Sequence, residues 1–353
     1  MNLFKRLLRY QIEVLINFPT AVLNGIRIRL LRSHKKFKSN GILPKNGNIA
    51  IIAAYPGTTS FDSLSRICSW LVEFDYKLII VINKNALANE WYEKLSTKYE
   101  WVMLRDNIGA DFGAYKAAIE LLYPHRDLID NLVLANDSMV YHPASKSLIR
   151  EIVNTETKNK VSSIFLHKQG VIHASSAFLR IGPSPLGDAK FWEFWKKYYP
   201  TQSKIKMVRR GEHKLTKVLG WKNIIPAISS ENLKNDFQLT PVELIQFLLW
   251  TARSSGEISR TLTDLPTTLP HEFLVEYGLE NFQVSDSLGL FCARYFGAPL
   301  KMDLPKRGLT TIKQFTNLLS GFGLDPEEIK ILQRILNSRE SFMTKSFFVR
   351  LFS

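Results

Sequence analysis

Cysteine is scarce in this chain. The two that are present, Cys68 and Cys292, lie far apart and form no C-x-x-C pair. This scarcity excludes a disulfide framework and the paired thiolates of zinc ribbons. Each cysteine sits among apolar residues at helical spacing, which is typical of a buried free thiol. Few cysteines also fit a reducing compartment, so we expect a cytoplasmic protein.

Long apolar runs are missing as well. No stretch reaches the roughly 18 to 20 residues that a bilayer-spanning helix needs. Near the N-terminus the apolar stretches are interrupted by Arg9, Glu13 and Asn17, and no small-residue cleavage site follows them. This pattern is unlike a secretory signal. The sequence therefore predicts neither a membrane span nor a secretory signal.

Several common catalytic signatures are also absent. There is no G-x-x-x-x-G-K followed by Ser or Thr, which argues against a P-loop kinase, and no G-x-S-x-G, which argues against an α/β-hydrolase. His142, His167, His173 and His213 show neither H-x-x-x-H nor H-E-x-x-H spacing. We therefore expect no zinc site.

Positive charge, in contrast, is abundant and uneven. The formal net charge is +15, and residues 1–40 hold nine Lys or Arg residues against the single acid Glu13. Apolar residues at helical spacing in this segment predict two basic amphipathic helices, which would attach the protein peripherally to the inner face of the cell membrane. Packing on the protein's own core and a nucleic-acid arm are the two alternatives. Because the rest of the chain has no nucleic-acid module, we expect no nucleic-acid partner.

The central part of the chain alternates between two periodicities. Short apolar runs predict buried strands at residues 48–55, 77–83, 100–106, 131–137 and 161–167, with amphipathic helices between them. This order predicts an α/β fold with a mostly parallel, Rossmann-type sheet flanked by helices. From about residue 182 aromatic helical segments dominate, and capped helices are expected at 310–319 and 325–336. We predict basic helices at 1–40, an α/β domain at 41–230 and a mainly helical region at 231–353 packed on it.

Polar clusters follow two of the predicted strands. The stretch "RDNIGAD" contains Asn107, Gly109 and Asp111, and the stretch "NDS" begins with Asn136 and Asp137. Ligands of such sheets bind at the carboxyl ends of the strands, which is where both clusters fall. One carboxylate together with substrate phosphates is a common way to hold Mg²⁺ or Mn²⁺. From spacing alone a plainer interpretation is favoured, in which Asp111 caps a helix and the other two residues end a strand.

Four stretches together carry a resemblance to a known family. The ordered set "DNIGADFGAYKAAIELL", "LVLANDSMVYHP", "SSAFLRIG…FWEFWKKY" and "RRGEHKLTKVLG" resembles the rhamnan-synthesis F family of bacterial polysaccharide glycosyltransferases, over about residues 48–226. More distantly the order is similar to inverting glycosyltransferases of the GT-A fold. The resemblance implies a GT-A-like domain. Its expected reaction is an inverting transfer of a sugar, such as L-rhamnose or another deoxyhexose, from a nucleotide-diphosphate donor to a cell-surface polysaccharide or lipid-linked glycan.

The resemblance also implies roles for the two polar clusters. Asn107, Gly109 and Asp111 would line the donor pocket. Asp137 would act in catalysis as the ligand of a divalent cation, Mg²⁺ or Mn²⁺. The chain departs here from the D-x-D pattern of GT-A glycosyltransferases, because Asn136 and Ser138 flank a single aspartate. This departure supports the alternative that the protein is a non-catalytic subunit of a polysaccharide assembly complex, binding a sugar nucleotide or a glycan.

Residues outside these clusters complete the expected site. By its position in the resemblance Glu212 would be the catalytic base that deprotonates the acceptor, and its alternative role is to stabilise the first turn of a helix. Arg209 and Arg210 would neutralise the leaving diphosphate, or else form a solvated basic face. Tyr55, after the first strand, would stack on the nucleotide base, or else belong to a plain turn.

Overall fold

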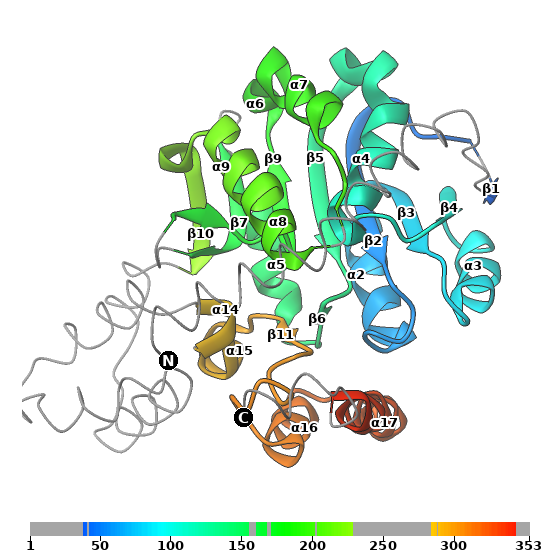
Figure 1. Ribbon diagram of the computed structural model, residues 1–353, viewed down its shortest axis with the longest axis vertical. Coiled ribbons are helices and arrows are strands. Elements are labelled where there is room, and N and C mark those ends of the chain that lie inside the picture. Colours follow the sequence, from blue (N-terminus) through cyan, green and yellow to red (C-terminus); the bar gives the residue numbers. More distant parts are fainter. Residues whose placement is uncertain are drawn as a thin grey trace, which may run out of the picture.

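The structure, a computed structural model, describes residues 38–40, 42–154, 160–167, 171–201, 203–228, 284–287 and 289–343. A large mixed β-sheet runs through its centre with helices on both faces (Figure 1). In spatial order its main strands are β1 (Lys38–Asn40), β4 (Trp101–Arg105), β3 (Lys77–Asn83), β2 (Gly47–Ala54), β5 (Ile129–Asn136), β9 (Phe178–Ile181), β7 (Val161–His167) and β10 (Ile224–Ile228). The predicted α/β class, with a mostly parallel sheet of Rossmann-like character, is confirmed.

The four strands β4, β3, β2 and β5 are parallel and form the core of the sheet. In β2, Ile51 lies between Ile79 of β3 and Leu134 of β5, and all residues from Ile49 to Ala54 are fully buried. Burial on both faces explains why these strands are continuously apolar in sequence rather than alternating. The five predicted strands are therefore all present, with ends that differ by at most two residues.

The strand β9 departs from the predicted parallel arrangement. The strand β9 lies between β5 and β7 and runs antiparallel to both. It contains Arg180, whose buried guanidinium donates to Asn131 Oδ1 at 2.7 Å. The sequence of β9 is only four residues long and is interrupted by this arginine, so its apolar pattern is weak. Strand direction depends on the partners reached after folding, which local periodicity does not encode.

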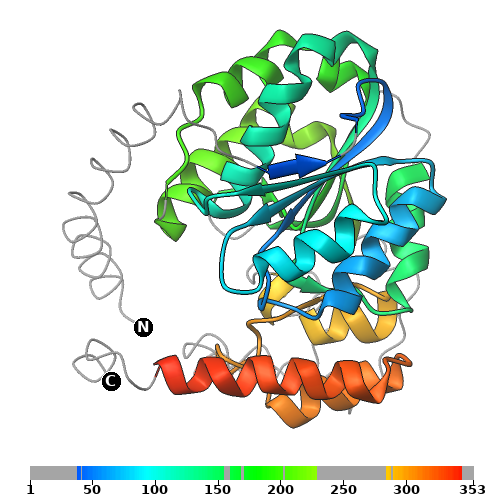
Figure 2. The ribbon, with the colours of Figure 1, turned by 90° about the vertical axis from the view of Figure 1, so that its right-hand side faces the viewer.

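Two hydrophobic cores, one on each face of the sheet, hold the helices. One face is covered by α2 (Phe61–Glu73), α3 (Ala88–Ser96), α5 (Ser145–Asn154) and α15 (Gly289–Phe296). The other face is covered by α4 (Ala110–Leu122), α6 (Pro183–Gly187), α7 (Ala189–Lys197) and α9 (Lys214–Leu219). Alternate residues of β2 divide between the two cores, with Ile51 in one and Ile52 in the other. Figure 2 shows the sheet nearly edge-on between the two helical layers.

The C-terminal part of the described chain is joined to the sheet domain through a small second sheet. The strand β11 (Leu300–Lys301) pairs antiparallel with β6 (Met139–Val140), which follows β5 directly. The helices α16 (Ile312–Gly321) and α17 (Pro326–Met343) close a third apolar core around Phe315, as predicted from their capped sequences. The carboxylate of Glu328, almost fully buried, accepts from Arg66 at 2.6 Å and so fixes α17 to α2.

Several predictions at the ends of the chain fall outside the described residues. Residues 1–37 and 344–353 are outside, as is most of the predicted helical stretch that begins at residue 231. Residues 38–40, predicted as part of a basic helix, instead form β1 and pair with β4. None of the helices within the described ranges is long and apolar enough to cross a bilayer.

Candidate functional site

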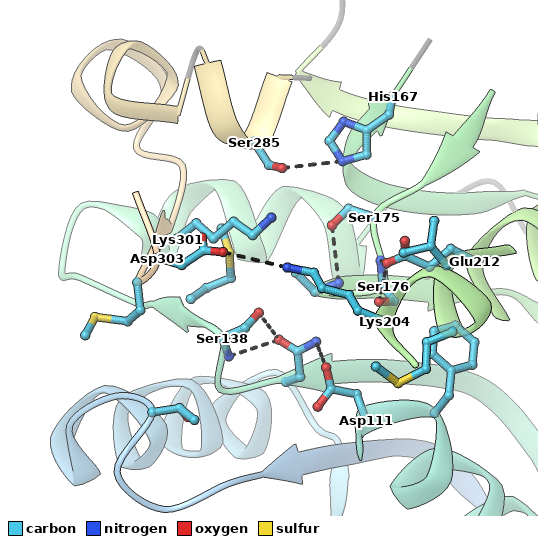
Figure 3. A pocket seen from close by; sticks show the side chains of 18 of the residues that line it. Asp111, Ser138, His167, Ser175, Ser176, Lys204, Glu212, Ser285, Lys301 and Asp303 are labelled. Carbon is cyan, nitrogen blue, oxygen red and sulfur yellow. Dashed lines mark hydrogen bonds and ion pairs between the residues drawn. The ribbon is translucent and has the colours of Figure 1, made fainter. Parts of the chain in front are cut away.

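A cavity of about 520 Å³ opens at the carboxyl ends of β5 and β7 (Figure 3). A volume of this size falls within the range of small-molecule and cofactor sites. Its walls come from the ends of strands, from the first turn of α4 and from segments near residues 176, 204–212 and 301–307. The lining residues are Thr58, Asp111, Phe112, Asn136, Ser138, Met139, His167, Ser175, Ser176, Ala177, Lys204, Met207, Val208, Glu212, Ser285, Lys301, Met302, Asp303 and Arg307.

The two polar clusters predicted from sequence meet at one wall of this cavity. Asn136, the last residue of β5, donates through Nδ2 to Asp111 Oδ2 at 2.9 Å. The Oδ1 atom of Asn136 accepts from the hydroxyl of Ser138 at 2.6 Å and from its backbone amide at 3.1 Å. Asp111, Asn136 and Ser138 all line the cavity. Figure 3 shows Ser138 and Asp111 along its lower wall.

Asp111 does not cap its helix, contrary to the plainer interpretation of the sequence. The N-cap of α4 is Gly109, in a left-handed conformation with φ of 82°, and Asp111 lies inside the first turn. A Cβ atom at Gly109 would overlap Pro200, so the glycine serves a close approach of two backbone segments. Neither Gly109 nor Asn107 lines the cavity. The tight turn therefore positions Asp111, while Gly109 in the turn packs against Pro200.

Asp137 lies beneath the cavity and not at its surface. Its side chain is 3% exposed, and its Oδ2 accepts from the backbone amide of Tyr55 at 2.6 Å. Burial raises the pKa of Asp137 to about 8, although the Tyr55 amide opposes this rise. The bond joins the ends of β2 and β5. Tyr55 therefore takes part through its backbone, and its side chain does not line the cavity.

Glu212 reaches the cavity from the interior of a continuous helical segment. This segment runs through α8 (Lys204–Met207), a π-helical turn (Val208–His213) and α9, and Ser203 caps its beginning. Glu212 therefore does not start a helix, and the alternative of first-turn stabilisation is wrong. Its Oε1 accepts from the Ser176 hydroxyl at 2.6 Å and from the Ser176 amide at 3.3 Å. A Cβ on the preceding residue, Gly211, would lie 2.8 Å from the Phe112 ring.

The charge of Glu212 acts on Asp111 across the cavity. Burial raises the pKa of Asp111 to about 6, and the negative charge of Glu212 adds to the rise, while the Asn136 amide opposes it. Behind Glu212 lies His173, whose Nε2 is 3.9 Å from Glu212 Oε2 and whose Nδ1 is 2.7 Å from the Val171 carbonyl oxygen. Asp111 and Glu212 thus face one space.

The basic residues at the cavity differ from those predicted. Arg209 and Arg210 are exposed and do not line it. Lys204, Lys301 and Arg307 line it instead, and Lys204 Nζ lies 3.9 Å from Asp303 Oδ2. The sequence offers one signal, the basic run "LKMDLPKRG" at residues 300–308. Its position after a long helical stretch gave no reason to place it beside residues 111 and 136.

The described side chains do not form a prepared cation site. Among the residues that the structure describes, no three His, Cys, Asp or Glu side chains come together as metal ligands. Asp137 has turned its carboxyl toward the Tyr55 amide, away from the cavity surface. A divalent ion would need several oxygen ligands around it. The cation remains a prediction from the resemblance.

Comparison with known proteins gives one distant relative. No family model matches the chain. Over 183 residues it is 27% identical to an uncharacterized protein, y4gN, of Sinorhizobium fredii (strain NBRC 101917 / NGR234). The match covers 51% of this chain and 47% of the relative, so the chain spans about half of that protein's length. The relative's description names no activity.

Proposed function

We propose that the protein is a glycosyltransferase that moves a sugar from a nucleotide-diphosphate donor to a cell-surface polysaccharide or lipid-linked glycan. One observation carries the proposal: two carboxylates, Asp111 and Glu212, face the same cavity as three basic side chains, at the carboxyl edge of a parallel sheet. A sugar donor has a neutral sugar, where the reaction takes place, and an anionic diphosphate. Carboxylates can act on the sugar and the acceptor, and basic side chains can bind the diphosphate. The GT-A resemblance of the sequence supports the same reaction.

The reaction we propose for this cavity is a single displacement. Glu212 removes the proton from an acceptor hydroxyl, and the acceptor oxygen forms a bond to the anomeric carbon of the sugar. The bond from that carbon to the diphosphate oxygen breaks, and the nucleoside diphosphate leaves with the electron pair. Attack opposite the leaving group inverts the anomeric centre. Ser176, which donates to Glu212 Oε1, orients the carboxylate and leaves its second oxygen available for the proton.

Asp111 is better suited to holding the sugar than to acting as the base. One of its oxygens already accepts from Asn136 at 2.9 Å, and its raised pKa makes it partly protonated near neutral pH. A carboxyl group so placed can bind a sugar hydroxyl in either protonation state. Ser138, Ser175 and Ser176 add hydroxyl groups to the same walls. Such groups match the hydrogen-bonding pattern of a sugar.

A second candidate function is binding without transfer. Its support is the Asn136–Asp137–Ser138 sequence, which keeps one aspartate and buries it against Tyr55. In that case the protein would be a sugar-nucleotide or glycan-binding subunit of a polysaccharide assembly complex. The two candidates share the cavity and differ only in whether the sugar is transferred.

The location of the protein at the membrane is proposed from the sequence. The basic amphipathic segment at residues 1–40 would place the cavity at the inner face of the cell membrane, where lipid-linked acceptors are reached. Vesicle flotation of the full chain, with neutral and with anionic lipids, tests this part separately. We expect the protein to bind anionic vesicles and not neutral ones. Binding to neither kind of vesicle would oppose this part of the proposal.

The deciding experiment follows donor binding and turnover in the same preparations. Thermal shifts are first measured with dTDP-, UDP- and GDP-sugars, since a ligand that binds the folded state raises the melting temperature. Release of nucleoside diphosphate is then measured with the donor that binds, for wild type and for Glu212→Gln. We expect the variant to keep the thermal shift and to lose about 10²- to 10⁴-fold in turnover. Glu193→Gln, at an exposed carboxylate paired with Lys197, is the matched control.

The outcomes separate the two candidates. Binding with no turnover in wild type under any acceptor would support the binding subunit. Turnover that is equal in wild type and Glu212→Gln would remove Glu212 from the mechanism. Absence of any thermal shift with the whole donor panel would oppose both.

A further inference from the structure

We propose that His173 is a positioning residue for Glu212, and that it takes over the proton which this carboxylate removes from the acceptor hydroxyl. The inference rests on the proposed function, because it adds a residue to the same reaction. His173 does not line the cavity, so it acts through Glu212 and not through contact with a substrate.

One short segment holds both oxygens of the Glu212 carboxylate. The Ser176 hydroxyl donates to Oε1 at 2.6 Å, and His173 Nε2 lies 3.9 Å from Oε2. The segment begins with β8 (His173–Ala174), which pairs antiparallel with β7. The Ala174 amide also donates to the hydroxyl of Thr216 in α9 at 3.0 Å, which ties β8 to the helical segment that carries Glu212. Backbone pairing therefore sets the position of the imidazole relative to the carboxylate.

The contacts of the His173 ring decide which of its nitrogens carries a hydrogen. Its Nδ1 lies 2.7 Å from the carbonyl oxygen of Val171, and a carbonyl oxygen can only accept a hydrogen bond. In the neutral ring Nδ1 therefore keeps the hydrogen, and Nε2 has a lone pair. Because Nε2 is the nitrogen near Glu212, the ring can take up a proton on the side of the carboxylate.

The proton from the acceptor hydroxyl has a defined route through this pair. The hydroxyl gives its proton to Glu212 Oε2 while its oxygen bonds to the anomeric carbon, and the proton then moves from Oε2 to His173 Nε2. The products of this transfer are a carboxylate and an imidazolium, which later releases the proton to water. A separation of 3.9 Å is longer than a hydrogen bond, so the transfer requires one bridging water or a small shift of the Glu212 side chain.

The transfer makes removal of the hydroxyl proton more favourable. An imidazole is intrinsically a stronger base than a carboxylate, so the proton is held more tightly at the end of the step. Burial penalises the imidazolium, because the His173 side chain is only 6% exposed. The negative charge of Glu212, whose side chain is 19% exposed, offsets this penalty at close range.

Within the described ranges two further imidazoles flank His173. Its ring centroid lies 5.0 Å from that of His167 and 4.6 Å from that of His213. Partial burial lowers the pKa of His213, and the positive charge of His173 lowers it further, while Glu212 opposes this lowering and Arg209 adds to it. A proton on His173 therefore keeps His213 neutral. The ring in contact with the carboxylate is the one that holds the charge.

NMR of the full chain, labelled with ¹⁵N at histidine, tests the pairing without any substrate. The His173→Asn variant identifies the His173 signals. We expect the neutral His173 ring to carry its hydrogen on Nδ1. We also expect it to take up its second proton at a pH about half a unit to one unit lower in Glu212→Gln than in wild type, because the stabilising charge is gone. Glu193→Gln, at an exposed carboxylate paired with Lys197, is the control and should leave the His173 titration unchanged.

The pH dependence of kcat/KM tests the role of His173 in the reaction. His173→Asn keeps a hydrogen-bond donor for the Val171 carbonyl oxygen and removes Nε2. We expect it to lower kcat/KM about tenfold at neutral pH and to move the fall in activity at acidic pH about one to two units lower, since the first proton then goes to a carboxylate. The thermal shift with the nucleotide-sugar donor should be unchanged. His125→Asn, at a half-buried histidine that does not line the cavity, is the matched control.

Each result bears on the proposal. A neutral His173 ring with its hydrogen on Nε2, or a His173 titration that is the same in wild type and Glu212→Gln, would overturn it. A uniform loss of activity at every pH in His173→Asn would also overturn it, since a merely structural role has that effect. Absence of turnover in wild type would reject the transferase, and the role of His173 with it, whatever the NMR titration shows. The two failures are therefore distinguishable.

Discussion

The side-chain amide of Asn136 donates to the carboxylate of Asp111 over 2.9 Å, and this bond joins the end of β5 to the first turn of α4. Both residues also line the cavity. The two polar clusters are thus neither a plain turn and cap nor a set of groups directed only at a ligand. The same hydrogen bond that fixes the local structure orients a carboxylate toward the site.

Substitution Asn136→Asp should make stability depend strongly on pH. The variant replaces a donor to Asp111 with a second buried acid, and two adjacent carboxylates cannot both ionise at low cost. We expect a loss of about 1–3 kcal/mol in unfolding free energy near pH 8, most of it recovered near pH 4, where both acids are protonated. Urea unfolding at the two pH values measures this. Asn154→Asp, at an exposed position in α5, should show no such recovery.

Asp137 should lower the stability of the wild-type protein as pH rises. Its folded-state pKa of about 8 lies above the ordinary value of an unfolded aspartate near 4, so the folded state binds more protons between these limits. Stability is therefore fully present below about pH 4 and is lost progressively as pH rises toward 8. We expect Asp137→Asn, whose side-chain oxygen can still accept from Tyr55, to flatten this slope. Identical pH profiles of unfolding free energy in the two proteins would contradict the assignment.

Glycine at position 211 should be required for the packing of the π-helical turn. A Cβ there would lie 2.8 Å from the Phe112 ring, which stacks on Trp195 with ring centroids 5.7 Å apart. We expect Gly211→Ala to lose about 1–3 kcal/mol of unfolding free energy and to lower turnover, since the displaced turn carries Glu212, the proposed base. Gly187→Ala is the control, because a Cβ at that position meets no atom within 4 Å. Equal stability of the two variants, measured by urea unfolding, would show that Phe112 can move aside.

The titration of Asp111 should depend on the charge of Glu212. The negative charge of Glu212 helps to raise the pKa of Asp111 to about 6. Removing that charge in Glu212→Gln should lower the pKa of Asp111, because burial alone then opposes its ionisation. Carbon NMR of aspartate carboxyl groups through a pH titration measures the change. An unchanged midpoint would place the two groups too far apart to interact.

Ser176 should matter for transfer more than for donor binding. Its hydroxyl donates to Glu212 Oε1 at 2.6 Å and so orients the base. We expect Ser176→Ala to lower turnover by about tenfold, with the affinity for nucleoside diphosphate unchanged. Ser176→Thr keeps a hydroxyl and should recover part of the activity. A parallel loss of affinity and turnover in Ser176→Ala would instead indicate a direct contact with the donor.

The fold was predictable to the extent that it depends on buried strands. The apolar runs at residues 48–55 and 77–83 have both faces covered in the structure, which is why their periodicity was informative. The antiparallel strand β9 was not predicted, because its four residues include the buried Arg180 and its direction is set by β5 and β7. Local sequence carries little information about such long-range pairing.

The site was predictable only where it coincides with strand ends. Asp111, Asn136 and Ser138 were expected at the carboxyl edge, and the structure places all three at the cavity. The hydrogen bond between the Tyr55 amide and the Asp137 carboxyl was not expected. The direction in which a carboxyl at a strand end points depends on the neighbouring strand. Lys301 and Arg307 come from a segment whose position depends on the pairing of β11 with β6, which nothing near them in sequence specifies.

Because β11 pairs with β6, the cavity is completed only late in the synthesis of the chain. The wall that holds Asn136 leaves the ribosome long before the wall that holds Lys301 and Arg307. A growing chain therefore has the strand ends on one side of the cavity, but it lacks the opposite side until those later residues have emerged. A complete cavity becomes a property of chains that extend beyond Arg307, and a premature stop before Lys301 would leave the strand ends without their facing wall.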